Sequence, residues 1–155
     1  IDSLRKANDK MSIRTTVIVG FPSETDKEFQ ELYNFVKDVE FDRLGVFKYS
    51  EEEGTSGAKD FKDNISSTVK QERYDAIMML QQGINFKKNK SRVGSVEKIL
   101  IDVANDDCSL GRSFRDAPEV DNYVKINQKL KVGSMYNVKI NKAYEYDVQG
   151  DIVNE

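Results

Sequence analysis

The sequence is poor in the residues that most often carry chemistry in proteins. It contains no histidine, the commonest general base and metal ligand, and only one cysteine. A single cysteine excludes a disulfide framework and any zinc or iron–sulfur centre ligated by cysteines of this chain alone. No apolar run approaches the roughly 18 residues of a membrane span, and no signal peptide opens the chain. We therefore expect a cytoplasmic protein and, because Ile1 lies in a polar, helix-like stretch, a piece of a longer one.

Charge is nearly balanced, with 24 basic and 27 acidic residues and a net charge of −3. This balance disfavours a general nucleic-acid binder, which usually has a basic excess. Residues 91–155 hold 9 Lys or Arg against 11 Asp or Glu, a net charge of −2. Because phosphate contacts supply most non-specific affinity for nucleic acids, a basic protein is the better electrostatic partner for this segment.

The first half of the chain has the pattern of an α/β protein. Its first strand, RTTVIVG, has a continuous apolar core, which suits a strand buried on both faces. Thr25 and Glu28 have capping-box spacing at the start of a helix. Strand, helix and strand in succession predict a βαβ unit with parallel pairing. The expected elements are strands over 14–20 and 41–49 and helices over 25–39 and 67–89.

The second half reads as short strands separated by turn residues. Five such strands in about 60 residues predict a small closed all-β barrel of the OB type, and the domain boundary is expected near residue 91. Its aromatic residues either fill the barrel core, the more frequent case, or form a stacking platform for nucleobases. Cys108, in a polar turn, is expected to be an incidental free thiol. The expected strands are Val96–Val103, Leu110–Phe114, Tyr123–Ile126, Tyr136–Ile140 and Tyr146–Val153, and the aromatic residues are Phe114, Tyr123, Tyr136, Tyr144 and Tyr146.

Two loops follow the predicted parallel strands and are expected to open on one rim, where ligands of α/β sheets bind. In VGFPSET, Gly20 lets a ligand approach the backbone, and the alternative is an ordinary loop in which Thr25 caps the helix. In YSEEEGTSGA, the carboxylates of residues 51–53 either form an acidic rim for a basic partner or are simply solvated.

Four blocks resemble a known family along essentially the whole chain: TTVIVGFPSETDKEFQEL, FDRLGVFKYSEEEGT, QERYDAIMMLQQGI and GRSFRDAPEVDNYV. Together they are similar to the methylthiotransferases of the radical S-adenosylmethionine superfamily. The resemblance implies that residues 1–90 are the carboxyl-terminal part of a TIM-like radical S-adenosylmethionine barrel and residues 91–155 an OB-like TRAM domain. Two features depart from the family: Ser23 stands where glycine is most frequent, and the CxxxCxxC motif is absent and would lie upstream of Ile1.

The same resemblance implies a function for the longer protein. Its branch that modifies proteins adds a methylthio group to the β-carbon of an aspartate in small-subunit ribosomal protein S-twelve. It uses S-adenosylmethionine and two [4Fe–4S] clusters, whose ligands lie outside this chain. The fragment is expected to be monomeric, inactive alone, and without catalytic or metal-ligating residues. The implied cofactor-binding residues are Val19, Gly20, Phe21, Tyr49 and Ser50, and the implied substrate-binding residues are Glu51, Glu52 and Glu53.

Two other functions stay open. A tRNA methylthiotransferase of the same superfamily would need a basic face on the barrel. A non-enzymatic module would use the barrel to bind RNA or protein, with the α/β half as a scaffold.

Overall fold

The computed structural model of the chain describes residues 1–8, 10–118 and 120–153. They fall into two compact units, 1–84 and 85–155, and the division lies inside the longest helix. Glu119, in the fourth family-like block, lies outside the described residues. The domain boundary expected near residue 91 stays a prediction.

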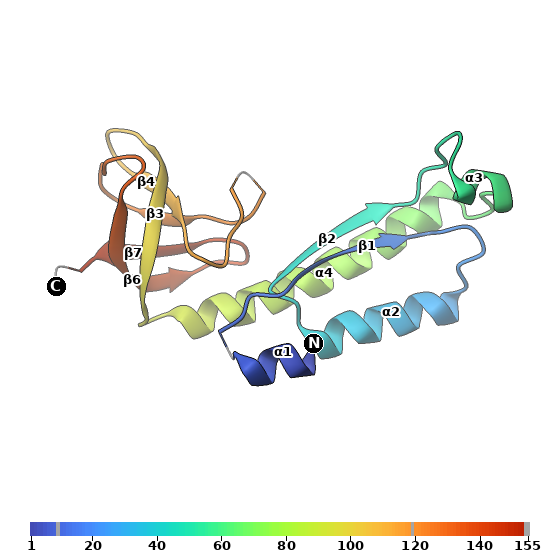
Figure 1. The fold of residues 1–155 in the computed structure, drawn as a ribbon, viewed down its shortest axis with the longest axis horizontal. Helices are drawn as coiled ribbons and strands as arrows, with labels where there is room; N and C mark the ends of the chain where they lie inside the picture. Colours follow the sequence, from blue (N-terminus) through green and yellow to red (C-terminus); the bar gives the residue numbers. More distant parts are fainter. Residues whose placement is uncertain (9, 119, 154–155) are drawn as a thin grey trace. The chain divides into compact units, whose positions relative to one another are not determined.

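The first unit is a βαβ arrangement with additional helices (Figure 1). Its two strands pair in parallel, with Arg14 opposite Arg43 and Val19 opposite Lys48, which confirms the predicted pairing. A short helix, absent from the sequence prediction, interrupts the acidic loop. The elements are α1 (Asp2–Ala7), β1 (Arg14–Val19), α2 (Asp26–Val39), β2 (Arg43–Lys48), α3 (Ser56–Asp60) and the part of α4 (Ser67–Arg92) up to residue 84.

Helices cover one face of this two-stranded sheet. The core joins Val19 and Val46 of the strands to Val36 of α2 and Ile77 of α4. Because side chains alternate along a strand, the neighbouring positions point the other way. On that other face Ile18 is 55% exposed, and Phe47, which pairs with it on β2, is 62% exposed. Burial of β1 on both faces, as its apolar run predicted, is therefore wrong for the described residues, because α2 and α4 pack on the same side.

The start of α2 has the predicted capping box. The Thr25 hydroxyl accepts a hydrogen bond from the Glu28 amide at 3.3 Å, and the Glu28 carboxylate accepts one from the Thr25 amide at 2.8 Å. The second bond holds the pKa of Glu28 below its usual value, because it favours the charged carboxylate. The helix therefore begins where the sequence indicates, and this start fixes the end of the preceding loop.

The second unit contains a closed five-stranded barrel. The strands neighbour one another in the order β3-β4-β5-β7-β6, with β5 and β7 parallel and the other pairs antiparallel. Closure removes exposed strand edges and confirms the predicted OB-like barrel. The strands are β3 (Val96–Ala104), β4 (Ser109–Arg112), β5 (Val124–Ile126), β6 (Met135–Ala143) and β7 (Val148–Ile152).

Isoleucine and valine fill the barrel core, so the expectation of an aromatic core is wrong. Only Tyr136 among the five aromatic residues packs against the core, as a half-buried side chain. The others lie at strand ends and in turns, where a large ring can extend from the barrel, and they are exposed: Phe114, Tyr123, Tyr144 and Tyr146. The core side chains are Ile99, Ile101, Val124, Ile126, Val138, Ile140 and Val148.

The part of the chain that the structure describes lacks two features that mark common classes of function. No helix in this part of the chain combines the length and apolar character needed to cross a membrane. Nor do these residues bring together three histidine, cysteine, aspartate or glutamate side chains that could hold a metal ion. Cys108 is a half-buried free cysteine.

Candidate functional site

The loops after β1 and β2 lie together, as the parallel pairing predicts. The Tyr49 amide donates a hydrogen bond to the Val19 carbonyl at 2.9 Å. The Phe21 ring meets the Tyr49 ring edge-on at 5.1 Å between centroids, and it meets the Phe61 ring at 5.5 Å. Val19 is buried, whereas Phe21 is 39% exposed. Val19, Phe21 and Tyr49 therefore form one rim with an accessible aromatic surface.

Gly20 has a structural role in this rim. Its φ of 71° lies in the left-handed region that favours glycine. A β-carbon there would overlap the Lys70 side chain, and the Gly20 amide already donates to the Glu24 carboxylate at 2.6 Å. Its proposed role in cofactor binding stays a prediction, and substitution of Gly20 cannot test that role cleanly because it disturbs the loop itself.

Ser23 also adopts a left-handed conformation, with φ of 70°. This accounts physically for the glycine that the resembling family most often has there, since glycine enters this region without steric cost. In this chain the Ser23 amide donates to the Asn64 side-chain oxygen at 2.8 Å, which helps to hold the loop. The departure from the motif therefore leaves the turn in the glycine-type conformation.

Lys70 of α4 connects both loops. Its buried ammonium donates to the Tyr49 carbonyl at 3.1 Å and to the Asp63 carboxylate, and it lies 5.2 Å from the centre of the Tyr49 ring. Its methylene chain occupies the space beside Gly20. Lys70 therefore fixes the relative position of the two strand ends.

Arg73, one turn further along α4, binds the first loop from the same side. Its guanidinium donates to the Glu24 carboxylate at 2.7 Å, to the Glu24 carbonyl at 3.1 Å and to Asp26 at 2.8 Å. It also lies 5.4 Å from the centre of the Phe29 ring. Sequence reasoning missed both cations. Their spacing was the available signal, because it places Lys70 and Arg73 on the same side of the helix as the apolar Ile77. A charged side chain on that buried side needs a buried partner.

The acidic segment after β2 is open to solvent. Ser50 and the three glutamates, Glu51, Glu52 and Glu53, are exposed. The Ser50 hydroxyl donates to the Glu52 carboxylate at 3.2 Å, and the Thr55 hydroxyl donates to the Glu52 carbonyl at 2.8 Å. Thr55 also caps α3 by accepting from the Ala58 amide. The segment therefore presents three carboxylates beside the aromatic rim and ends in a short helix.

Asp63 provides a test of the contacts around Lys70. The hydrogen bond from Lys70 is the largest cause that holds the pKa of Asp63 below its usual 3.8, because it favours the charged carboxylate. The carboxylate therefore stabilises the fold above pH 3.8, and this stabilisation is lost as the pH falls through the lowered value. We expect Asp63→Asn to destabilise the first unit at pH 7 but much less at pH 3. Urea unfolding at both pH values checks this, and an equal effect at both would contradict it.

The sequence is similar to known proteins over its whole length. Residues 93–153 match the family model described as the TRAM domain. A protein named ribosomal protein uS12 methylthiotransferase RimO from Clostridium kluyveri is 43% identical over 157 residues, covering 100% of this chain and 35% of the relative. A protein of the same name from Phocaeicola vulgatus is 44% identical over 156 residues, covering 99% of this chain and 36% of the relative.

The chain thus spans about a third of the length of the curated relatives that it matches. The match to the TRAM family covers the closed barrel, and the match to the relatives also includes the βαβ unit and its two strand-end loops. The chain is therefore similar along its whole length to proteins named RimO, and its residues 93–153 match the TRAM domain family.

Proposed function

We propose that this chain is part of a radical S-adenosylmethionine methylthiotransferase that adds a methylthio group to the β-carbon of an aspartate in ribosomal protein uS12. The observation that carries the proposal is the 43% identity, over the entire chain, to a protein named ribosomal protein uS12 methylthiotransferase. The radical chemistry and the aspartate β-carbon are what the resemblance of the four sequence blocks implies. In the relatives the aligned part is accompanied by nearly twice its own length of further sequence. The complete protein therefore performs the reaction, and this chain contributes to binding.

The residues of this chain fit a contact with S-adenosylmethionine but do not form a site for a [4Fe–4S] cluster. With Cys108 as its only cysteine, the chain cannot hold a [4Fe–4S] cluster by itself, and we place the ligands of both clusters outside it. The rings of Phe21 and Tyr49, at the ends of adjacent strands, fit an apolar contact with S-adenosylmethionine. Bound cofactors supply the radical chemistry, and the protein supplies placement and exclusion of water.

Within the rim we assign different tasks to the five cofactor-binding residues. The Val19 carbonyl and the Gly20 amide are engaged by Tyr49 and Glu24, so they shape the loop. Phe21 and Tyr49 flank the cofactor with their rings. Ser50 has an exposed hydroxyl at the edge of the rim and borders either the cofactor or the substrate.

The uncovered sheet face supports a place for residues 1–90 in a larger barrel, with the TRAM domain from about residue 91. Parallel sheets occur almost only where both faces are covered. Here the face with Ile18 and Phe47 is exposed in the described structure. We propose that the remainder of the longer protein covers this face as the inside of a TIM-like barrel.

Charge favours a protein substrate over tRNA. Glu51, Glu52 and Glu53 are exposed next to the rim, and residues 91–155 have a net charge of −2. An acidic surface attracts a basic ribosomal protein and repels a polyphosphate. We accordingly propose uS12 as the substrate, and we further propose that the complete protein acts on it as a monomer in the cytoplasm.

Neutralising the acidic segment in the complete protein tests the substrate assignment. We expect the triple change Glu51→Gln, Glu52→Gln and Glu53→Gln to raise KM for uS12 about tenfold, because each exposed charge contributes up to about 1 kcal/mol. Transfer of the methylthio group, followed by mass spectrometry of uS12, should keep its kcat. Raising the salt concentration should reduce the difference between the two proteins.

The matched control removes three exposed carboxylates elsewhere in the first unit, at Asp2, Glu31 and Asp38. It changes the net charge equally and should leave KM nearly unchanged. Equal KM values for both triple variants would overturn the role of the acidic segment. Modification of tRNA and not of uS12 by the complete protein would instead assign the chain to the tRNA-modifying branch.

A further inference from the structure

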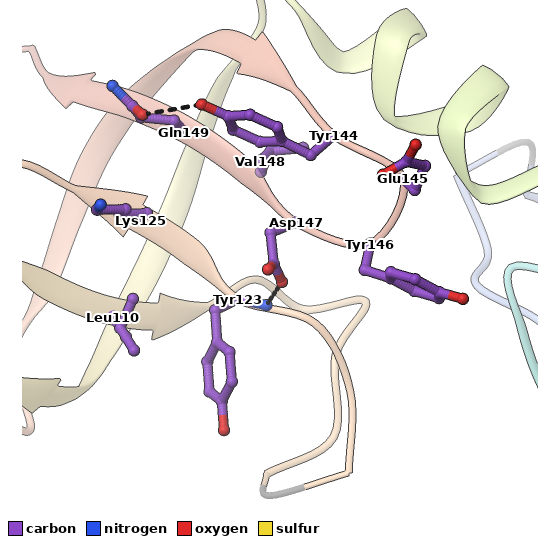
Figure 2. A pocket seen from close by; sticks show the side chains of 9 residues that line it. All are labelled: Leu110, Tyr123, Lys125, Tyr144, Glu145, Tyr146, Asp147, Val148 and Gln149. Carbon is purple, nitrogen blue, oxygen red and sulfur yellow. Dashed lines mark hydrogen bonds between the residues drawn. The ribbon is translucent and has the colours of Figure 1, made fainter. Parts of the chain in front are cut away.

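The turn between β6 and β7 borders a cavity of about 400 Å³ on the barrel (Figure 2). Tyr123, Tyr144 and Tyr146 are among the residues that line it, and each of these residues is between 37% and 42% exposed. Glu145 lies in the turn between two of these tyrosines, and Lys125 projects from β5. The cavity therefore combines three tyrosine side chains with charged groups of both signs.

Hydrogen bonds from backbone and side-chain groups hold the turn in one conformation. The Tyr144 amide donates to the Asp147 carbonyl at 2.9 Å, and the Asp147 carboxylate accepts from the Tyr123 amide at 2.9 Å (Figure 2 shows the second bond). Asn89, which is 2% exposed, donates through its side-chain amide to the Tyr144 and Tyr146 carbonyls, both at 3.0 Å. One buried amide group thus fixes the backbone on either side of Glu145.

Asn89 is itself held in place. The Arg92 guanidinium donates to the Asn89 side-chain oxygen at 3.3 Å. Arg92 also forms a two-point ion pair with Glu97, at 3.0 and 2.9 Å, and both side chains are largely buried. Because the tyrosines and Glu145 sit on a backbone that is already ordered, a ligand binding there loses little loop entropy.

The chemistry of this surface suits a cation. Aromatic ring faces attract Lys and Arg, and here the Lys142 ammonium already lies 5.5 Å from the centre of the Tyr144 ring. Glu145 is exposed and forms no ion pair within the described part of the chain. A phosphate group would instead meet two carboxylates, Glu145 and Asp147, against two lysines, Lys125 in the cavity lining and Lys142 at the Tyr144 ring. The surface therefore has no excess of positive charge, which disfavours a nucleic acid.

We propose that this surface, formed by Tyr123, Tyr144, Glu145 and Tyr146, binds an arginine side chain of a basic protein. The planar guanidinium stacks on a tyrosine ring and donates two hydrogen bonds to the Glu145 carboxylate, which a lysine ammonium cannot match in geometry. The inference rests on the proposed function for the identity of that protein, the basic substrate uS12. The cavity thus gives the TRAM domain a specific contact with the substrate, in addition to long-range attraction.

The test is a titration of the full 155-residue chain with a fluorescent glycine–serine peptide that carries four arginines, followed by anisotropy at low salt. We expect Glu145→Gln to weaken binding about fivefold, since it removes the carboxylate and keeps the shape. Asp107→Asn is the matched control: Asp107 is exposed on the β3–β4 turn and does not line the cavity. It should change binding by less than about 1.5-fold, as expected for one remote screened charge.

Two further arms make the outcome decisive. Tyr146→Leu should weaken binding of the arginine peptide about threefold, because it removes a ring face. It should not change binding of a control peptide in which glutamines replace the four arginines. Equal effects of Glu145→Gln and Asp107→Asn would overturn the proposal. A second result would also overturn the proposal: oligouridylate binds more tightly than the arginine peptide, and Glu145→Gln strengthens the binding of oligouridylate. The site would then be an RNA-binding site. Unchanged amide spectra of each variant exclude loss of folding.

These titrations need no cofactor, so they test arginine binding at the cavity independently of the proposed methylthio transfer. Arginine binding that depends on Glu145, in a complete protein that does not modify uS12, would reject the proposed function and retain the site. Modification of uS12 with an unchanged KM in Glu145→Gln, together with equal peptide binding, would reject the site and retain the function.

Discussion

Replacing Arg73 by methionine is expected to lower the free energy of unfolding of the first unit by about 3 kcal/mol, the usual result of removing one partner of a buried ion pair. The Arg73 side chain is 6% exposed and Glu24 is 12% exposed, whereas Asp26 is fully exposed at 100%. The loss therefore comes almost entirely from Glu24. Its carboxylate would stay buried with, among the described residues, only the Gly20 amide to compensate its charge.

The same substitution should disturb the candidate cofactor rim, because Glu24 connects Arg73 to Gly20. Arg73→Lys is the informative comparison. It keeps the charge, but its donors sit on one nitrogen atom, whereas Arg73 reaches Glu24 and Asp26 from two separate nitrogens, so it should recover only part of the stability. Native-state hydrogen exchange of the amides in β1 and β2 measures this unit separately from the barrel.

Lys27→Met is the control for a surface charge. The Lys27 and Glu31 side chains are 86% and 68% exposed and lie 3.9 Å apart, so we expect an effect below about 0.5 kcal/mol. If Arg73→Met and Lys27→Met had similar effects, the Arg73–Glu24 contact would not be a stable feature of the protein in solution.

The elements that the sequence predicts well are those with a local physical signal. The capping box at Thr25 and Glu28 marks the start of α2, because its two residues lie within one turn of each other. The five barrel strands were likewise found within a few residues of their observed bounds. Parallel pairing of β1 and β2 followed from the intervening helix alone.

The site was less predictable, because its contacts join residues far apart in the sequence. Position at the strand ends was enough to bring Phe21 and Tyr49 together. The partners of Lys70 and Arg73 lie up to 49 residues away, and neither loop sequence indicates them. Exposure of Tyr144 and Tyr146 was also missed, since an apolar ring at a strand end has no periodicity to show which way it points.

The barrel offers a second large effect, at a position where two strands approach closely. We expect Gly111→Ala to destabilise the barrel by about 3 kcal/mol, at the upper end for an added methyl group in a packed interior. A β-carbon at Gly111 would lie 2.5 Å from the Leu100 carbonyl oxygen and 2.7 Å from a methyl group of Ile99. Gly111 pairs with Ile101 on one side and Val124 on the other, so the backbone of β4 cannot move away without breaking a strand pair.

Gly83→Ala provides the opposite expectation with the same chemical change. Gly83 is exposed within α4 and a β-carbon there meets nothing within 4 Å, so alanine should stabilise the helix by about 1 kcal/mol. Thermal unfolding of both variants, with hydrogen exchange to assign the change to one unit, measures the contrast. A destabilised Gly111→Ala beside a stabilised Gly83→Ala would show that close strand approach, and not loss of glycine flexibility, requires Gly111. Equal small effects would mean that β3 and β4 are further apart in solution than the 2.5 Å contact requires.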